Sequence, residues 1–176
     1  MLSREKILKC LRLLGEALAD QGLHGEILLT GGAAMCLVHS ARDMTKDIDA
    51  LYEPKDAVNR VAAIIAEQEN LPADWLNDSV KGFIGPNAPT EEFIAFKGLR
   101  VQSVSAEYLL AMKLMSARYG EKDYDDIRFL LHKLKINEAN QAYDVVEIYF
   151  AKDRILPKTA YVIESIIEEM RDAKNR

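Results

Sequence analysis

A strand that runs into a pair of glycines and then into a helix is the feature that most constrains the fold of this chain. The apolar run Glu26–Leu29 predicts a buried strand over residues 26–30, and Ala33–Val38 predicts a helix over residues 32–39. Thr30-Gly31-Gly32 lies between them. Such a junction leaves backbone N–H groups free at the start of the helix, where a phosphate is favoured. The sequence therefore predicts an anion-binding turn at the end of a buried strand.

A second predicted strand, over residues 46–51, carries two acids. Side chains alternate along a strand, so Asp47 and Asp49 are expected on one face, with their Cα atoms about 6.6–6.8 Å apart. Two carboxylates beside an anion-binding turn can hold Mg²⁺ against a triphosphate. Either motif is common by itself, since Gly-Gly after a strand is usually only a tight turn. The two in this order, with Arg42, Thr45 and Lys46 just ahead of the acids, form a more specific pattern.

This order of motifs resembles the nucleotidyltransferase superfamily that includes DNA polymerase β. The run from Arg42 to Asp49 is similar to the Arg-x-x-Thr-x-Asp-x-Asp segment of small bacterial members, including the AbiEii-like toxin group. The resemblance implies that the chain transfers an NMP from an NTP to an acceptor hydroxyl of RNA or protein, as the toxin of a toxin–antitoxin pair. An antitoxin or a regulatory protein would be a further partner. It also implies Mg²⁺, as two ions or one, bound by Asp47 and Asp49. The implied nucleotide-binding residues of this half are Thr30, Gly31, Gly32, Arg42, Thr45 and Lys46.

Two predicted helices in the second half carry charges on apolar faces. Lys113 is the only charge between Tyr108 and Met115, and either snorkels at a partly exposed edge or reaches toward a phosphate. In the next helix Asp123 is expected between apolar residues and Asp126 at the edge of the same face. Asp123 could also complement the helix dipole.

The AbiEii-like pattern has a lysine on one helix and Lys-Asp-x-x-Asp at the start of the next. The resemblance therefore implies that Lys113 contacts nucleotide phosphates and that Asp126 orients the lysine or acts as a late acid. Both would be catalytic. The nucleotide-binding residues that it implies here are Arg118, Lys122 and Asp123.

One departure from the family pattern concerns a third metal-binding carboxylate on a later strand. The expected strand, Leu99–Val104, contains no acid. Glu91 or Glu92 of the preceding strand could replace it if the register allowed, Asp126 could fill the gap, or the metal site is incomplete.

The remaining sequence predicts an α+β chain, with a small mixed sheet of the nucleotidyltransferase fold flanked by helices and followed by a helical C-terminal half. Residues 1–104 would form the α/β core with its N-terminal helix, and residues 105–176 a helical region packed on it as one compact unit. The net charge of −5 disfavours a general nucleic-acid coat. With no long apolar run and no paired cysteine motif, the sequence predicts a cytoplasmic protein without a membrane partner. The elements expected besides those above are helices over 3–21, 54–69, 106–119, 121–134, 138–150 and 157–173, and strands near 81–84, 91–96 and 99–104.

Two other functions fit parts of the pattern. An inactive protein of the same fold would bind a nucleotide or a protein partner without chemistry. A two-metal nuclease would use Asp47, Asp49 and Asp126, but it leaves Gly31, Gly32 and Lys113 without a role.

Overall fold

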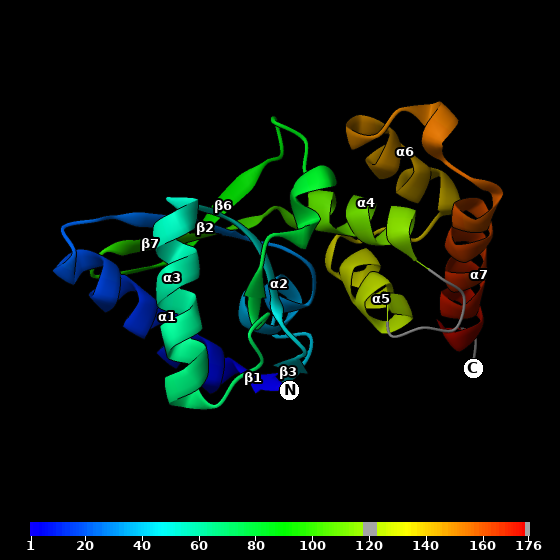
Figure 1. The fold of residues 1–176 in the computed structure, drawn as a ribbon. Helices are drawn as coiled ribbons and strands as arrows, with labels where there is room; N and C mark the ends of the chain where they lie inside the picture. The colour runs from blue at the N-terminus through cyan, green and yellow to red at the C-terminus, as the bar shows by residue number, and fades with distance from the viewer. Residues whose placement is uncertain (118–122, 175–176) are drawn as a thin grey trace. The chain divides into compact units, whose positions relative to one another are not determined.

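The protein is described from a computed structural model, which covers residues 1–117 and 123–174. Its contacts divide the chain into two units, which are treated separately below. The first unit comprises Met1–Ile84 and Thr90–Val104, and the second comprises Gly85–Pro89 and Ser105–Arg176. The α+β class is confirmed: mixed sheet structure in the first part of the chain is followed by a helical half (Figure 1).

The first unit is built on a five-stranded mixed sheet with strand order β5-β4-β2-β7-β6. Strand β2 is central because it pairs antiparallel with β4 and parallel with β7. A separate two-stranded sheet joins β1 to β3. The strands are β1 (Leu2–Ser3), β2 (Gly25–Leu29), β3 (Met44–Thr45), β4 (Ile48–Glu53), β5 (Leu76–Asn77), β6 (Thr90–Phe96) and β7 (Leu99–Val104).

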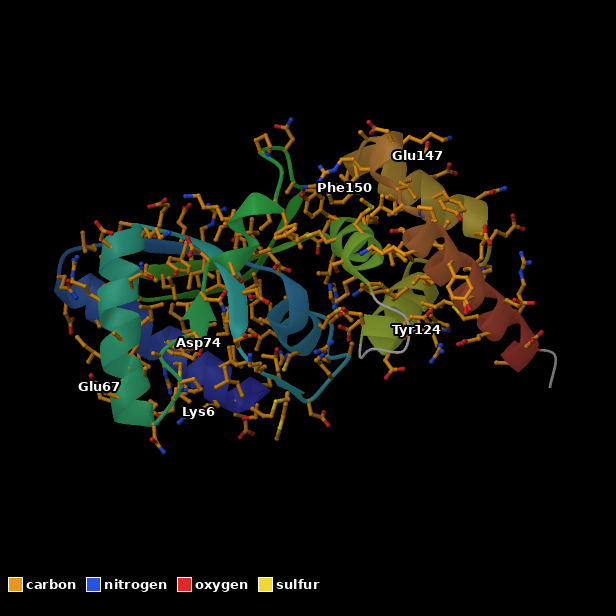
Figure 2. The ribbon with its side chains drawn as sticks, turned by 45° about the vertical axis from the view of Figure 1, so that its right-hand side comes forward. Lys6, Glu67, Asp74, Tyr124, Glu147 and Phe150 are labelled. Atoms are coloured by element: carbon orange, nitrogen blue, oxygen red, sulfur yellow. The ribbon has the colours of Figure 1, made fainter. Side chains whose placement is uncertain are left out.

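Helices α1 and α3 pack against each other and against the sheet, α1 next to β7 and α3 next to β4 (Figure 1). Lys6 and Lys9 of α1 both reach the Glu69 carboxylate at the end of α3, at 2.6 and 2.7 Å, and Lys6 is labelled in Figure 2. These two lysines hold the pKa of Glu69 below its ordinary value. The helices of this unit are α1 (Arg4–Asp20), α2 (Gly31–Leu37), α3 (Lys55–Glu69) and the 3-10 helix η1 (Ser79–Gly82).

Trp75 anchors the short strand β5 to the rest of the first unit. Its side chain is completely buried, and its indole N–H donates to the carbonyl of Ala62 in α3 at 3.0 Å. Its own carbonyl accepts the Ile48 N–H of β4 at 2.7 Å. These bonds bring the segment that follows Trp75 alongside the start of β4.

The second unit is a helical assembly in which α4 contacts each of the other three α-helices. Its core includes an edge-to-face contact of Tyr108 with Tyr149, whose ring centroids are 4.9 Å apart. Phe150, labelled in Figure 2 at the end of α6, also stacks on Tyr108. The helices are α4 (Ala106–Ser116), α5 (Asp123–Lys133), α6 (Ala139–Tyr149), α7 (Pro157–Lys174) and the 3-10 helix η2 (Lys152–Arg154). Among the described residues, no helix is long and apolar enough to cross a membrane.

Several sequence-based expectations for the first unit were wrong in detail. The segment near 81–84 is not a strand, because Ser79–Gly82 forms a 3-10 helix. The sequence predicted no strand between α3 and η1, where β5 lies, and it did not predict β1 or β3 either. The strand expected from Lys46 begins only at Ile48. The preceding Met44–Thr45 pairs with β1 instead, so the chain changes partner between the two strands.

Candidate acid and glycine site

The two glycines of the predicted anion-binding turn lie directly against functional side chains. Gly31 has a φ of +52°, and a Cβ atom built on it would lie 3.2 Å from Asp49 Oδ2. A Cβ atom on Gly32 would lie 2.4 Å from Thr45 Oγ1 and 3.3 Å from an Arg42 guanidinium nitrogen. The missing side chains therefore let a carboxylate, a hydroxyl and a guanidinium approach one short piece of backbone.

Pairing of the strands places Asp49 beside this turn. The Thr30 N–H donates to the Asp49 carbonyl at 3.0 Å, just beyond the ladder in which Leu29 faces Ala50. Residues directly opposite in an antiparallel pair share a face, so Thr30 and Asp49 project to the same side. Thr30 is 1% exposed, and its hydroxyl has no hydrogen-bond partner in the described part of the chain. Ile48, just before Asp49, is completely buried and anchors the start of β4.

Asp47 lies beside Asp49 but outside the strand, which corrects the expectation of two acids on one strand face. Its side chain is half-buried. Burial raises the pKa of the Asp47 carboxyl above its ordinary value, and the neighbouring negative charge of Asp49 raises it further. The charge of Asp74 acts in the same direction, whereas Lys46 lowers this pKa. The two acids therefore interact although only one of them belongs to β4.

Two polar residues, one at the end of β5 and one in η1, lie beside Asp49, and sequence reasoning did not include either among the site residues. Asn77 faces Asp49 across the parallel pair of β4 and β5. Ser79 Oγ lies 3.2 Å from Asp49 Oδ1 and 2.6 Å from Asn77 Oδ1. The run Asn77-Asp78-Ser79 is polar, but the contact depends on a long-range strand pairing that no local pattern shows.

The other predicted site residues of the first unit differ in how deeply their side chains are buried. Thr45 is 3% exposed and lies against Gly32, as does the guanidinium of Arg42. Lys46 is exposed, and its influence on Asp47 is electrostatic. Thr30, Gly31, Gly32, Arg42, Thr45, Lys46, Asp47 and Asp49 thus gather in one region of the first unit.

The second unit contains a separate cluster of charges. Lys113 Nζ of α4 lies 2.7 Å from Asp123 Oδ1 and 2.7 Å from Asp126 Oδ2, both on α5. The Lys113 side chain is 8% exposed, that of Asp126 is 5% exposed and that of Asp123 is 32% exposed. Asp126 is therefore the more buried acid, and Asp123, expected between apolar residues, is the more exposed one. Asp126 is drawn inward because it neutralises a buried ammonium group. Arg118 and Lys122 lie outside the described residues.

Strand order excludes Glu91 and Glu92 as the missing third carboxylate. They belong to β6, which β2 and β7 separate from β4, a distance of about 14 Å at the usual strand spacing. Glu92 is occupied with Arg100 and with Gln102, whose amide lies 2.8 Å away. In residues 1–117 and 123–174 no group of three or more His, Cys, Asp or Glu side chains is arranged to hold a metal ion.

Comparison with protein-family models found no match. Comparisons with curated proteins and with solved structures found none either. The geometry of the acid and glycine site is therefore the basis for a functional proposal.

Proposed function

We propose that the first unit binds a nucleoside triphosphate with Mg²⁺ and that the protein is a nucleotidyltransferase, which moves an NMP to an acceptor hydroxyl. The main observation in support of this proposal is that the Asp49 carboxylate packs on the Gly31 backbone, with Asp47 at its side. This arrangement sets two negative charges against a turn that also faces Arg42 and Thr45.

The acid pair has the character of a cation site. In the described part of the chain neither Asp47 nor Asp49 forms a salt bridge, and their mutual repulsion raises the pKa of Asp47. A bound divalent cation would remove that repulsion. Mg²⁺ is commonly held by one or two carboxylates together with water and substrate phosphates, so the absence of a third acid does not prevent binding.

Ser79 and Asn77 extend the set of oxygen ligands. The Ser79 hydroxyl lies at hydrogen-bond distance from both Asp49 Oδ1, at 3.2 Å, and Asn77 Oδ1, at 2.6 Å. Hydroxyl and amide oxygens this close to a carboxylate could join it, with water, in the oxygen shell that Mg²⁺ prefers. These neutral oxygens fit Mg²⁺ without adding a third negative charge.

The surroundings of Gly32 have the character of an anion site. The Arg42 guanidinium and the Thr45 hydroxyl both lie against Gly32. A guanidinium can bind phosphate oxygens through two parallel hydrogen bonds, and a hydroxyl can donate one more. The proposal assigns these groups to the triphosphate, where they orient its phosphates beside the acid pair.

In the proposed reaction the acceptor hydroxyl oxygen would attack the α-phosphorus of the NTP, the bond between the α- and β-phosphates would break, and pyrophosphate and the hydroxyl proton would leave to solvent. This reaction would need little covalent chemistry from the protein. Mg²⁺, when bound, would neutralise the triphosphate and lower the pKa of the acceptor hydroxyl. Asp47 and Asp49 would hold the ion, and Arg42 and Thr45 would hold the phosphates in a fixed position, so that binding energy supports alignment of the reacting groups. The phosphate contact and the acid role implied for Lys113 and Asp126 remain predictions, since both charges are already paired with each other.

An inactive nucleotide-binding protein of the same fold is the second candidate. It is favoured by the acid-free strand β7, where Gln102 is engaged with Glu92. A nuclease fits less well, because it gives no role to the Arg42 and Thr45 side chains around Gly32. RNA or protein as acceptor, and an antitoxin as partner, are implied by the family resemblance alone.

Incubation of the full chain with each of four α-labelled NTPs and Mg²⁺, with and without total RNA, tests the proposal. Transfer of label to RNA or protein is expected, and it should be lost in Asp49→Asn. Asp20→Asn is the matched control, because Asp20 is an exposed acid at the end of α1. Nucleotide binding without transfer would favour the inactive candidate, and RNA cleavage without NTP would favour the nuclease. The absence of all three would refute the proposal.

A further inference from the structure

Three residues at the start of the chain contact helix α2 and strand β3, the two elements that approach each other at Gly32. Leu2, Ser3 and Arg4 are named the N-terminal brace here. Leu2 and Ser3 form β1, and Arg4 is the first residue of α1. Their contacts lead to the two elements that meet at Gly32, namely α2 and the segment containing Thr45.

Arg4 secures the far end of α2. Its guanidinium donates to the carbonyl of Cys36 at 3.1 Å and also to that of Leu37, the last residue of the helix. Carbonyls in the last turn of a helix lack intrahelical partners and carry partial negative charge, so a guanidinium there supplies both a donor and a complementary charge. Because α2 has only seven residues, holding its end also limits movement of Gly31 and Gly32.

Strand β1 secures the other side of the turn. Leu2 pairs with Thr45 and Ser3 pairs with Met44 in an antiparallel ladder. Leu2 is 2% exposed, so its side chain anchors this pair in the core. This backbone pairing restrains the position of Thr45, whose hydroxyl lies against Gly32.

Both guanidiniums near the turn act on one thiol. Burial raises the pKa of Cys36, whereas the positive charges of Arg4 and Arg42 lower it. Cys36 lies within α2, and Arg42 reaches Gly32 in that helix. Arg4 therefore belongs to the same electrostatic neighbourhood as the proposed phosphate-binding arginine.

We infer that Arg4 is a positioning residue for nucleotide binding, and that the N-terminal brace holds the Gly31-Gly32 backbone and Thr45 in register for the phosphates. This inference rests on the proposed function. It adds a residue that contacts neither metal nor nucleotide and acts through α2. Gly32 and Thr45 approach so closely that a small displacement of α2 changes the space between them.

Hydrogen exchange and nucleotide titration of three full-length variants test the inference. Arg4→Met keeps the aliphatic stem and removes the donors, and Arg4→Lys keeps the charge. Arg12→Met is the matched control, because Arg12 is an exposed arginine on the same helix. Without nucleotide, the amides of residues 34–39 and 44–46 should exchange at least about tenfold faster in Arg4→Met than in wild type, because the variant loses both hydrogen bonds from the Arg4 guanidinium to α2.

Titration with Mg²⁺ and each of ATP, GTP, CTP and UTP gives the second readout. Arg4→Met should weaken the tightest of these about tenfold, Arg4→Lys should recover part of the loss, and Arg12→Met should match wild type. If amide hydrogen exchange is unchanged in Arg4→Met, the inference that the N-terminal brace holds α2 is wrong. If exchange is faster but nucleotide affinity is unchanged, Arg4 does not position the nucleotide site. A wild-type protein that binds none of the four nucleotides would refute the proposed function, and exchange would then still decide whether the brace holds α2.

Discussion

Two groups of acids in this molecule have opposite electrostatic surroundings. In the second unit Asp123 and Asp126 both lie 2.7 Å from Lys113 Nζ, in a largely buried position. In the first unit Asp47 and Asp49 lie together without a salt bridge among the described residues. Asp123 and Asp126 therefore have a buried counter-charge in Lys113, whereas Asp47 and Asp49 have none among the described residues.

Desolvation explains why the difference is informative. A charge taken out of water is costly unless it is paired, so the Lys113 cluster must be complete for the fold to be stable. A half-buried acid pair can persist at smaller cost, because water still reaches it. The comparison therefore predicts a stabilising role for the lysine cluster, and it is consistent with the proposed ligand-binding role of Asp47 and Asp49.

The largest expected effect is on the stability of the lysine cluster. Lys113→Met should reduce the free energy of unfolding by about 3–5 kcal/mol, because it removes the buried ammonium group that contacts both Asp123 and Asp126 at 2.7 Å. Adding Asp126→Leu should recover much of the loss, so the double variant should lose less than the sum of the two single variants. Urea denaturation followed by circular dichroism measures all three. Lys152→Met is the control, since Lys152 is 82% exposed beside Glu147 and should change stability by less than about 1 kcal/mol. Equal losses of unfolding free energy in Lys113→Met and Lys152→Met would show that the lysine cluster does not stabilise the second unit.

Gly32→Val should damage both packing and binding in the first unit. The added side chain would collide with Thr45 Oγ1, which lies 2.4 Å from even an ideal Cβ position. We expect a loss of about 1–3 kcal/mol in stability and weaker nucleotide binding by calorimetry. Gly82→Val is a suitable control, because no atom lies within 4 Å of a Cβ built there. Unchanged nucleotide affinity in Gly32→Val would remove the turn from the site.

Asp47→Asn and Asp49→Asn should separate binding from stability. Each should weaken Mg²⁺-dependent nucleotide binding about tenfold or more, as expected for loss of a charge-assisted contact. Each should also leave the free energy of unfolding within about 1 kcal/mol of wild type, because neither acid forms a salt bridge with any residue that the structure describes. Calorimetric titration and thermal unfolding give the two values. If both variants unfold the protein and the refolded variants still bind nucleotide, the two acids have a structural role rather than a role in binding.

The pH dependence of Asp47 is the smallest expected effect. Its pKa in the folded protein is raised above the ordinary value of 3.8, so the folded state holds this proton more tightly than the unfolded chain. The carboxyl therefore reduces stability as pH rises from about 3.8 through the raised pKa. In the proposed site Mg²⁺ would bind the ionised pair, so its affinity should fall as pH falls through the same window. Calorimetric titrations with Mg²⁺ and nucleotide in buffers of different ionisation enthalpy would detect the proton that Asp47 releases on binding. If Asp47→Asn releases the same proton, Asp47 is not its source.

Elements with a strong local pattern were predictable from the sequence. The apolar spacing of Ile7, Leu8, Leu11, Leu14 and Leu18 predicted a helix over residues 3–21, and α1 runs from Arg4 to Asp20. The central strand before Gly31 was also predicted within one residue of its observed end at Leu29. These elements are long enough for the periodicity of buried side chains to define them.

Features that depend on distant partners were not predictable. Strands β1, β3 and β5 have two residues each, too few for an alternating pattern, and exist because another segment pairs with them. Ser79 reaches Asp49 only because β5 lies beside β4. For the same reason the sequence suggested Asp49 as a site residue but not its neutral oxygen neighbours.

The position of Trp75 provides a spectroscopic probe that distinguishes the two units. It is the only tryptophan in the chain, and it is buried between β5 and α3 in the first unit. Excitation at wavelengths absorbed by indole alone therefore reports on the first unit, while the second contributes no emission. Because the Trp75 carbonyl accepts the N–H of Ile48, the residue between the two acids, a change in fluorescence on adding Mg²⁺ and nucleotide would follow the site without an attached dye.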